Sequence, residues 1–335
     1  MPPKPARAAH VAVACATAIA AAPAAATEYH VVPLAGVNAQ SGGINKDEIV
    51  AGAVGFVPAL FDHGAITMLG GDSGFATAVN AKGNATGTSY GGGRQHAFLW
   101  KNGTPRDIAP MFGATDATQG VAIDKDSGVL CVESAPGGTR SFVFLEGRYT
   151  EVKGPPGYGY VTGAAINDAG DVAGNATPPA RTAHAFARIG GVSTDLGALG
   201  GAKAWSTATA INLAGVVAGD SAKVAGTTAD VTAFTWTAGV LKNLGALKPA
   251  TRSRALAIDW NGRVVGTSYA DAGNTQPRAF LHDGTHMIDL NKRLDAASAG
   301  WVLETATGIA AGGAITGMGS FGGSRMPYLA TPLSR

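Results

Sequence analysis

The sequence predicts an all-β protein, a seven-bladed β-propeller built from four-stranded antiparallel blades. Three observations support this prediction: a ten-residue phrase that recurs seven times, a second phrase that follows the copies, and a composition rich in glycine. The chain holds 49 glycines in 335 residues, and only 14% of its residues are charged. That balance is typical of many short strands joined by tight turns.

The first 26 residues have the three regions of a secretory signal peptide. Lys4 and Arg7 precede a short apolar stretch, and Ala24 and Ala26 form a small-residue cleavage site. We expect cleavage after Ala26, a secreted or periplasmic protein, and a single propeller domain over residues 27–335. The apolar stretch is too short for a permanent membrane anchor.

Removal of this segment leaves a formally neutral chain. The 25 Lys and Arg residues lose Lys4 and Arg7, so 23 basic residues remain against 23 acidic ones. Neutrality gives no support for nucleic acid or an anionic membrane as partner. Cys15 leaves with the signal peptide, and we expect the remaining Cys131 to pack as a small hydrophobe.

The first phrase has the form of a strand, a turn and a second strand. An apolar run ends at Asn or Asp, which can hydrogen-bond the backbone ahead, and a glycine follows that accepts a positive φ. The copies recur at intervals of 35 to 51 residues, close to the length of a propeller blade. They are GINKDEIVAG (43–52), AVNAKGNATG (78–87), AIDKDSGVLC (122–131), AINDAGDVAG (165–174), AINLAGVVAG (210–219), AIDWNGRVVG (257–266) and GIAAGGAITG (308–317). Because Asn and Asp share one position, we interpret them as turn formers and not as catalytic or metal-binding groups.

The second phrase adds two more strands to each repeat. Its alternation places Phe98 and Trp100 on one face, and likewise Phe234 and Trp236. The copies are LFDHGAITMLG (60–70), AFLWKNGTPRDIA (97–109), FVFLEGRYTEV (142–152), AFARIGGVSTDLGAL (185–199), AFTWTAGVLKNLGAL (233–247) and AFLHDGTHMIDL (279–290). Four strands a, b, c and d per repeat indicate propeller blades.

The last repeat lacks a fourth strand. We expect residues 28–35 to pair beside residues 326–333, so that the N-terminal strand completes the seventh blade and closes the ring. The alternative is an open β-solenoid with distant ends. The best helical candidate, KRLDAASAG (292–300), is one or two turns within a loop.

The paired phrases resemble the bacterial HAF family of extracellular repeat proteins. The resemblance rests on A-I-N-x-x-G-x-V-x-G, H-A-F-x-W-x-x-G and D-L-G-A-L-G-G, covers nearly all of residues 43–333, and is clearest in 165–201 and 208–247. It implies export and a propeller-like β repeat. It brings no established catalytic site or ligand, so no functional residue is carried over.

The histidine of His-Ala-Phe occupies a variable position. Counted two residues before the phenylalanine, that position holds His96, Arg140, His184, Thr232, Arg278 and, in the last copy, Met326. A general base cannot be exchanged for Thr or Met, so we expect a polar residue that caps strand c or bonds a neighbouring blade. The serine motifs GDSG (71–74) and GTSYG (87–91) lie in repeat context and lack the strand–elbow–helix or triad context that catalysis needs.

Function is expected on loops held by the rigid ring. In a meander the b–c and d–a connections emerge on one face, which we call the long-loop face, and we expect both kinds to be longer than the a–b and c–d turns. Aromatic rings beside arginines suit sugars or acidic ligands. The candidate ligand-binding residues are Arg94, Arg140, Tyr158, Tyr160, Arg181, Trp205, Arg254, Tyr269, Trp301 and Arg325.

The hypothesis is therefore an exported, monomeric binding or interaction module for an extracellular glycan or protein, more a binder than an enzyme, with no metal and no cofactor. The alternatives are a secreted polysaccharide hydrolase or lyase on a propeller scaffold, and a structural surface-matrix protein. An enzyme would need two or three carboxylates, or a His–Tyr–Arg cluster, converging near the central channel. The pool of loop acids is Asp72, Asp116, Glu133, Asp220, Asp230, Asp271, Asp295 and Glu304.

Overall fold

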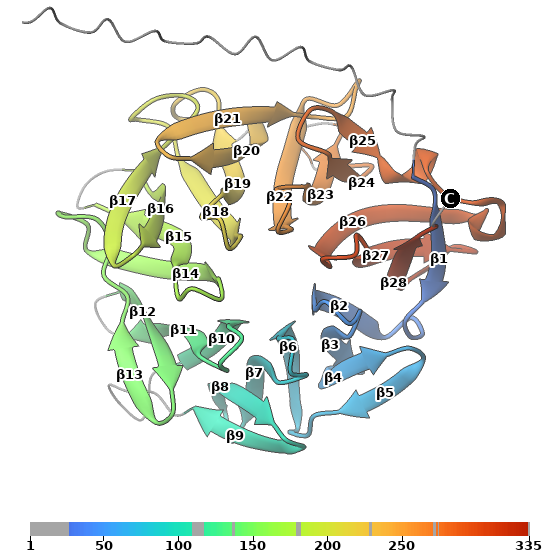
Figure 1. Cartoon of the computed structure of the whole chain (residues 1–335), viewed down its shortest axis with the longest axis horizontal. Coiled ribbons are helices and arrows are strands. Elements are labelled where there is room, and N and C mark those ends of the chain that lie inside the picture. The colour runs from blue at the N-terminus through green and yellow to red at the C-terminus, as the bar shows by residue number, and fades with distance from the viewer. Residues whose placement is uncertain are drawn as a thin grey trace, which may run out of the picture.

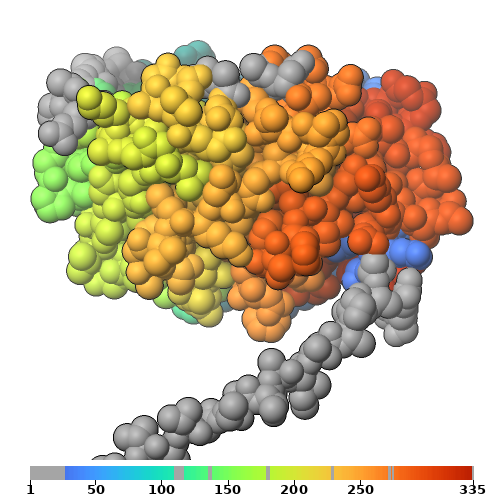
Figure 2. Space-filling view, turned by 90° about the horizontal axis from the view of Figure 1, so that it is seen from above, coloured from blue at the N-terminus to red at the C-terminus, as the bar shows by residue number. Residues whose placement is uncertain are grey.

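The computed structural model describes residues 27–108, 117–135, 138–178, 182–227, 230–270, 273 and 275–333. The expected signal peptide lies outside these residues. Seven four-stranded antiparallel sheets stand radially around a central axis, as the sequence predicts (Figure 1). Seen from the side, the blades of the C-terminal half follow one another around a short cylinder, from yellow-green to red (Figure 2).

The first four blades follow the chain from the axis outward. Blade I holds β2 (Ala39–Ile44), β3 (Val50–Val54), β4 (Val57–Asp62) and β5 (Ala65–Met68). Blade II holds β6 (Ser73–Val79), β7 (Ala85–Gly91), β8 (Arg94–Lys101) and β9 (Thr104–Ile108). Blade III holds β10 (Ala117–Ile123), β11 (Val129–Ala135), β12 (Gly138–Leu145) and β13 (Arg148–Glu151). Blade IV holds β14 (Tyr160–Ile166), β15 (Val172–Thr177), β16 (His184–Ile189) and β17 (Val192–Gly197).

The last three blades include the ring closure. Blade V holds β18 (Ser206–Ile211), β19 (Val217–Ala222), β20 (Val231–Thr237) and β21 (Val240–Gly245). Blade VI holds β22 (Arg252–Ile258), β23 (Val264–Tyr269), β24 (Arg278–His282) and β25 (Met287–Asp289). Blade VII holds β26 (Trp301–Ile309), β27 (Ile315–Phe321), β28 (Ser324–Pro332) and, as its outer strand, β1 (Tyr29–Pro33). The predicted closure is confirmed, because Tyr29 pairs with Pro332 and Pro33 with Tyr328.

Two 3-10 turns connect blades VI and VII. They are η1 (Leu290–Lys292) and η2 (Ala296–Ser298), capped by the side chains of Asp289 and Asp295. The short helical turns expected in residues 292–300 are therefore present in part, as single 3-10 turns.

The core lies between neighbouring blades. Strand b of one blade and strand a of the next face each other; Ala218 and Leu244 of blade V pack with Ala255, Val264 and Phe280 of blade VI. The aromatic position of strand c is fully buried in most blades, at Phe142, Phe186, Phe234, Phe280 and Tyr328. Cys131 is also fully buried, as the sequence predicts, and burial raises the pKa of its thiol.

A bulge in strand a explains the recurring glycine of strand b. The register of blade V shifts between Ala208 and Ala210, which brings the carbonyl of Thr207 against Gly219. A Cβ on Gly219 would lie 1.9 Å from that oxygen, so no side chain fits. Blade III exchanges the two partners: Cys131 takes the strand b position, and glycine stands opposite it, at Gly120.

Hydrogen bonds link the a–b turns of successive blades, from blade I to blade VII, around the central opening. In blade V, Asn212 Oδ1 accepts hydrogen bonds from the N–H groups of Ala214 and Val216, at 3.1 and 3.0 Å. Its Nδ2 donates across the blade boundary to the carbonyl of Asp259, at 3.1 Å. The same cross-blade bond joins Asn45 to Asn80 O, Asn80 to Asp124 O and Asn167 to Asn212 O.

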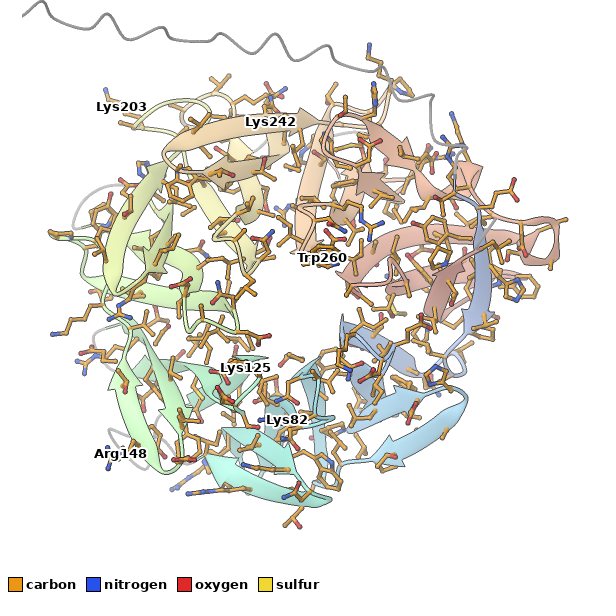
Figure 3. All side chains as sticks on the ribbon, viewed as in Figure 1. Lys82, Lys125, Arg148, Lys203, Lys242 and Trp260 are labelled. Atoms are coloured by element: carbon orange, nitrogen blue, oxygen red, sulfur yellow. The ribbon has the colours of Figure 1, made fainter. Side chains whose placement is uncertain are left out.

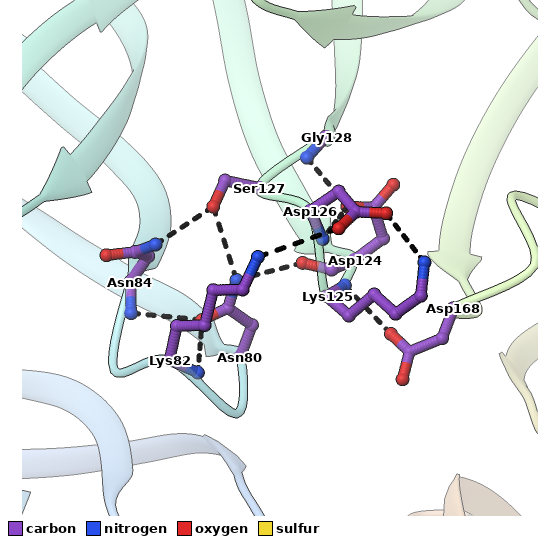
Figure 4. Close-up of polar contacts among 9 residues, drawn as sticks. All are labelled: Asn80, Lys82, Asn84, Asp124, Lys125, Asp126, Ser127, Gly128 and Asp168. Atoms are coloured by element: carbon purple, nitrogen blue, oxygen red, sulfur yellow. Dashed lines mark hydrogen bonds and ion pairs between the residues drawn. The ribbon is translucent and has the colours of Figure 1, made fainter.

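Blade III varies this bond because Asp124 has no side-chain donor. The backbone N–H of Lys125 donates instead to Asp168 Oδ1 of blade IV, at 2.8 Å (Figure 4). At the next irregular boundary Trp260 Nε1 donates to the carbonyl of Ala311. Lys82, Lys125 and Trp260, all in a–b turns, surround the opening in Figure 3. The Asn and Asp positions are thus turn formers that also link blades.

Candidate functional site

The long-loop face is uneven around the ring. Blades I, II and VII close their b–c connections as two-residue hairpins, since Val54 pairs with Val57, Gly91 with Arg94 and Phe321 with Ser324. In blade III, Ala135 pairs with Gly138, so two residues separate strands b and c there as well. The prediction that every b–c connection is longer is wrong for these blades. The reason is local: Gly92, Gly93, Gly322 and Gly323 take the positive φ that a tight hairpin turn requires. Longer b–c connections, residues 178–183, 223–230 and 270–277, belong to blades IV, V and VI.

Three predicted residues belong to blades V and VI, and one of them, Arg254, reaches across the boundary between these blades. Trp205 precedes β18, Arg254 lies in β22 and Tyr269 ends β23. Arg254 reaches across the boundary to Asp220 of β19, with Nε 3.7 Å from Oδ2. Tyr269 pairs in register with Arg252, whose charge acts on the same carboxyl. We call these five residues, with Thr207, the V–VI cluster.

Asp220 is the buried acid of this cluster. Its side chain is 6% exposed, and Thr207 Oγ1 donates to its Oδ1 at 3.2 Å. Burial raises the pKa of Asp220 to about 6, although Arg254, Thr207 and Arg252 each act to lower it. In blade IV the same position is Asn175, whose Oδ1 accepts a hydrogen bond from Ala208 N. A neutral amide is therefore sufficient for the link between blades at this position. A buried carboxyl such as that of Asp220 is less favourable for stability when it is ionised.

Buried polar atoms near the cluster lack partners within the described part of the chain. They are Trp205 Nε1 and the hydroxyls of Thr232 and Thr267. Buried polar groups are nearly always hydrogen-bonded, by protein, water or ligand. Thr232 and Thr267 lie on the strands next to those of Asp220 and Arg254.

A groove of about 930 Å³ lies outside the cluster, where the connection from blade V passes the outer strand of blade VI. We call it the V–VI groove. Lys248, Arg278, Lys292 and Arg293 contribute to its lining, and Asp289 is the one acid among the described residues that line it. The sequence analysis missed these residues. The signals were present in LKPAT (247–251) and DLNKRLD (289–295), where bases follow the outer strands of two successive blades.

Other predicted residues occupy separate places on the face. Arg94 lines a cavity of about 590 Å³ with Asp72 and Tyr90 on blade II. Arg140 and Tyr158 line another, of about 350 Å³, between blades III and IV. These cavities are not continuous with the V–VI groove, since none of their lining residues is shared with it.

Three predicted residues have structural partners instead. The ring of Tyr160 lies over Gly138, where a Cβ would come within 1.9 Å of it. Arg325 Nε donates to Glu304 Oε2 at 2.7 Å. Trp301, expected in a loop, is the first residue of β26 and only 8% exposed, because it packs against Phe321 and Tyr328. Arg181 lies outside the described residues.

The histidine position before strand c pairs within its own blade. His96 Nδ1 lies 2.7 Å from Asp107 Oδ2, and His184 Nδ1 lies 3.0 Å from both Asp195 oxygens. In blade VI, Arg278 donates to Asp289 at 3.1 Å. The expected bond to a neighbouring blade is thus replaced by a bond to the outer strand.

Asp195 shows how firmly this acid is held. It accepts hydrogen bonds from Tyr158, from Gly197 N and from His184. Burial acts to raise the pKa of Asp195, but these donors outweigh it and the pKa is lowered. The histidine and its acid thus link strands c and d of the same blade by a side-chain hydrogen bond.

The loop acids do not converge within the part of the chain described. Asp230 pairs with Lys223, Asp295 with His30, and Glu304 with Arg325, each on a different blade or connection. Asp116 and Asp271 lie outside it. No group of three or more His, Cys, Asp or Glu side chains suited to a metal occurs among the described residues. These residues also contain no helix long and apolar enough to cross a membrane.

Comparison with family models and with curated proteins finds no match. Solved structures do resemble the chain. Virginiamycin B lyase from Staphylococcus aureus gives a TM-score of 0.58 at 10% identity, covering 92% of this chain and 100% of the lyase. Oligogalacturonate lyase from Vibrio parahaemolyticus gives 0.55 at 12% identity, covering 90% and 93%.

A puromycin-hydrolysing peptidase from Mycobacterium tuberculosis gives a TM-score of 0.52 at 14% identity. The match covers 86% of this chain, which spans about half of the peptidase, 51% of its length. At such low identities the likeness establishes the fold alone: the chain is a seven-bladed β-propeller.

Proposed function

We propose that the protein is exported and acts as a monomeric binding module, taking a glycan or peptide ligand on the long-loop face over blades V and VI. The proposal is non-catalytic. The observation that carries it is the coincidence, on one blade boundary, of the V–VI cluster and the V–VI groove. The groove's volume of about 930 Å³ lies in the range of ordinary ligand sites.

The composition of the site supports binding over chemistry. The cluster offers one carboxyl, Asp220, with arginines and hydroxyls around it. Hydrolysis of glycosides uses a pair of carboxyl groups a few ångströms apart. Rings, hydroxyls and guanidinium groups on a rigid ring are instead the components of recognition.

One observation favours an enzyme as the second candidate. The pKa of Asp220, raised by burial to about 6, lies near neutrality, where a general acid or base works best. Arg254 beside it could neutralise a substrate carboxylate. Two of the similar folds belong to lyases, which adds the propeller scaffold to this argument but no residue.

The test is a screen of purified residues 27–335 against neutral and acidic glycans and against peptides, with Arg254→Gln as the diagnostic variant. We expect at least one ligand whose affinity falls about tenfold in Arg254→Gln, as for the loss of a charge-assisted hydrogen bond. The matched control is Arg148→Gln, an exposed arginine on blade III, across the ring (Figure 3).

Turnover of a glycan that Asp220→Asn abolishes would establish the enzyme instead. Absence of any ligand sensitive to Arg254 would refute the binding proposal. Export has its own measurement, the N-terminal residue of the protein recovered outside the cytoplasm. We expect Thr27, and an intact cytoplasmic chain starting at Met1 contradicts export.

A further inference from the structure

The V–VI groove has an unbalanced charge. Of its four cations, Arg278 is held by Asp289, with Nη1 3.1 Å from Oδ2. Asp289 also accepts from the backbone and side-chain nitrogens of Asn291, so its carboxylate is fully engaged. In the described part of the chain, no carboxylate forms an ion pair with the side chains of Lys248, Lys292 or Arg293.

This excess distinguishes the groove from the other cavities of the face. The Arg94 cavity contains Asp72, one acid for one base. The cavity of Arg140 contains Lys153 and also Glu151. The V–VI groove alone among these three sets four bases against one acid, and its rim adds His286. In a mature chain that is formally neutral, this clustering is local.

The cations come from two separate chain segments. Lys248 belongs to the connection that leaves blade V, and Lys292 and Arg293 follow the outer strand of blade VI through η1. Leu247, Pro249 and Met287 add apolar surface to the same lining. A ligand that contacts both segments would meet positive charge from each of them together with this modest apolar surface.

These features select among anionic ligands. The described residues that line the groove include no Phe, Tyr or Trp, and single-stranded nucleic acids depend on such rings for stacking. The adjoining strand β25 has three residues, too few to receive a peptide as an added strand. An acidic sugar chain needs neither feature. Its carboxylates or sulfates match lysine and arginine, and its C–H faces match the floor.

We propose that the V–VI groove binds an acidic oligosaccharide, a chain bearing carboxylate or sulfate groups. The inference rests on the proposed binding function and specifies the class of its ligand. Lys248 and Lys292 act as point charges on the two chain segments that line the groove, and Arg293 adds a planar donor. Arg278, already fixed by Asp289, sets the shape of the wall between them.

The experiment titrates residues 27–335 with four probes of known composition: a galacturonate hexamer, a heparin-derived hexasaccharide, neutral maltohexaose and a hexaglutamate peptide. The diagnostic variant is the double charge reversal Lys248→Glu with Lys292→Glu. Both lysines are exposed, so the fold should tolerate the change, and circular dichroism checks this. The matched control is Lys203→Glu, an exposed lysine in the connection between blades IV and V (Figure 3).

We expect one or both acidic saccharides to bind, maltohexaose not to bind, and the double variant to weaken binding at least about tenfold. Lys203→Glu should change the affinity less than about twofold. Raising the salt concentration from 0.05 to about 0.5 M should weaken binding, because exposed charges are screened.

Equal binding of maltohexaose and the acidic probes overturns the inference, as does hexaglutamate binding without either saccharide. An acidic saccharide that binds with equal affinity to the double variant also overturns it. If the wider screen finds a ligand that depends on Arg254 but not on Lys248 and Lys292, the inference falls and the binding function stands. If no ligand of any class binds, both fall.

Discussion

The two faces of the ring use the repeat in different ways. On the turn face, which carries the a–b and c–d turns, one design recurs, with Asn45, Asn80, Asn167 and Asn212 each bonded to the next blade. On the long-loop face, strands b and c of blades I, II, III and VII are two residues apart, while blades IV, V and VI carry longer connections. The recurring Asn positions therefore stabilise the ring, whereas the b–c connections vary in length and sequence and can take on a function.

Asp220 and Asn175 show this contrast at a single position. Both lie one residue after the strand b glycine, but Asn175 bonds the next blade as a neutral amide. Asp220 is buried with a carboxyl whose pKa is raised to about 6. When a residue lowers stability at this position in a single blade, it indicates a role other than holding the fold together.

The largest expected loss of stability comes from substitution of the recurring strand b glycine. Gly219→Ala should lower the free energy of unfolding by more than about 3 kcal/mol, because the new Cβ would overlap the carbonyl oxygen of Thr207. That oxygen can move away only if the pairing of strands a and b is disrupted. Urea unfolding followed by tryptophan fluorescence measures the change.

Gly312→Ala is the control for this substitution. It lies in the a–b turn of blade VII, has no positive φ, and a Cβ there meets no atom within 4 Å. Its effect should stay within about 0.5 kcal/mol. Equal stability of the two variants would show that the close approach of strand a does not explain the glycine.

Asp220→Asn should stabilise the protein at pH 8 and leave it unchanged at pH 4. Burial raises the folded-state pKa to about 6, above the ~3.9 of an unfolded aspartate. Stability from the bound proton is thus present below about pH 4 and lost as the pH rises through 6. The loss in the wild type is about 3 kcal/mol.

Unfolding curves at several values between pH 4 and 8 measure this difference. The gap between wild type and variant should open as the pH increases. A gap that closes with increasing pH would mean that Arg254 stabilises the carboxylate more than burial destabilises it.

The smallest expected loss of stability distinguishes the two roles of Asn212, which accepts hydrogen bonds within the a–b turn and donates one to the next blade. Asn212→Ala removes the turn acceptor and the donor to Asp259 O, and should cost about 2 kcal/mol. Asn212→Asp keeps the acceptor and loses only the cross-blade donor, so about half that cost is expected. Thermal unfolding at pH 7 compares them. Equal losses would locate the whole contribution in the bond between blades.

The fold was predictable because its signals are periodic. Seven copies of one phrase, six of them with Asn or Asp at the turn, marked the a–b turns, and the missing fourth strand of the last repeat indicated that β1 pairs with β28. The cross-blade bonds were not predictable, because they join residues about 45 positions apart whose orientation depends on ring geometry.

The candidate site was predictable only in part. Trp205 lies in a connection as expected, but Arg254 and Tyr269 belong to strands β22 and β23, where Arg254 faces Asp220 of the neighbouring blade. Trp301 was misplaced, because the start of β26 cannot be told from the preceding connection by composition. The V–VI groove needs two segments more than 40 residues apart, Lys248 and Lys292, so no local pattern reveals it.

The seam between β1 and β28 has a consequence for how the chain could be rearranged. Its two strands are not consecutive in the chain, unlike the other strand pairs within the described blades, and Tyr29 and Pro332 lie opposite each other across it. A short linker could therefore fuse the two ends, and new ends could be opened at a surface hairpin such as Gly92–Gly93. Such a circular permutant would keep every blade while moving the seam, so the ring has no obligatory first blade.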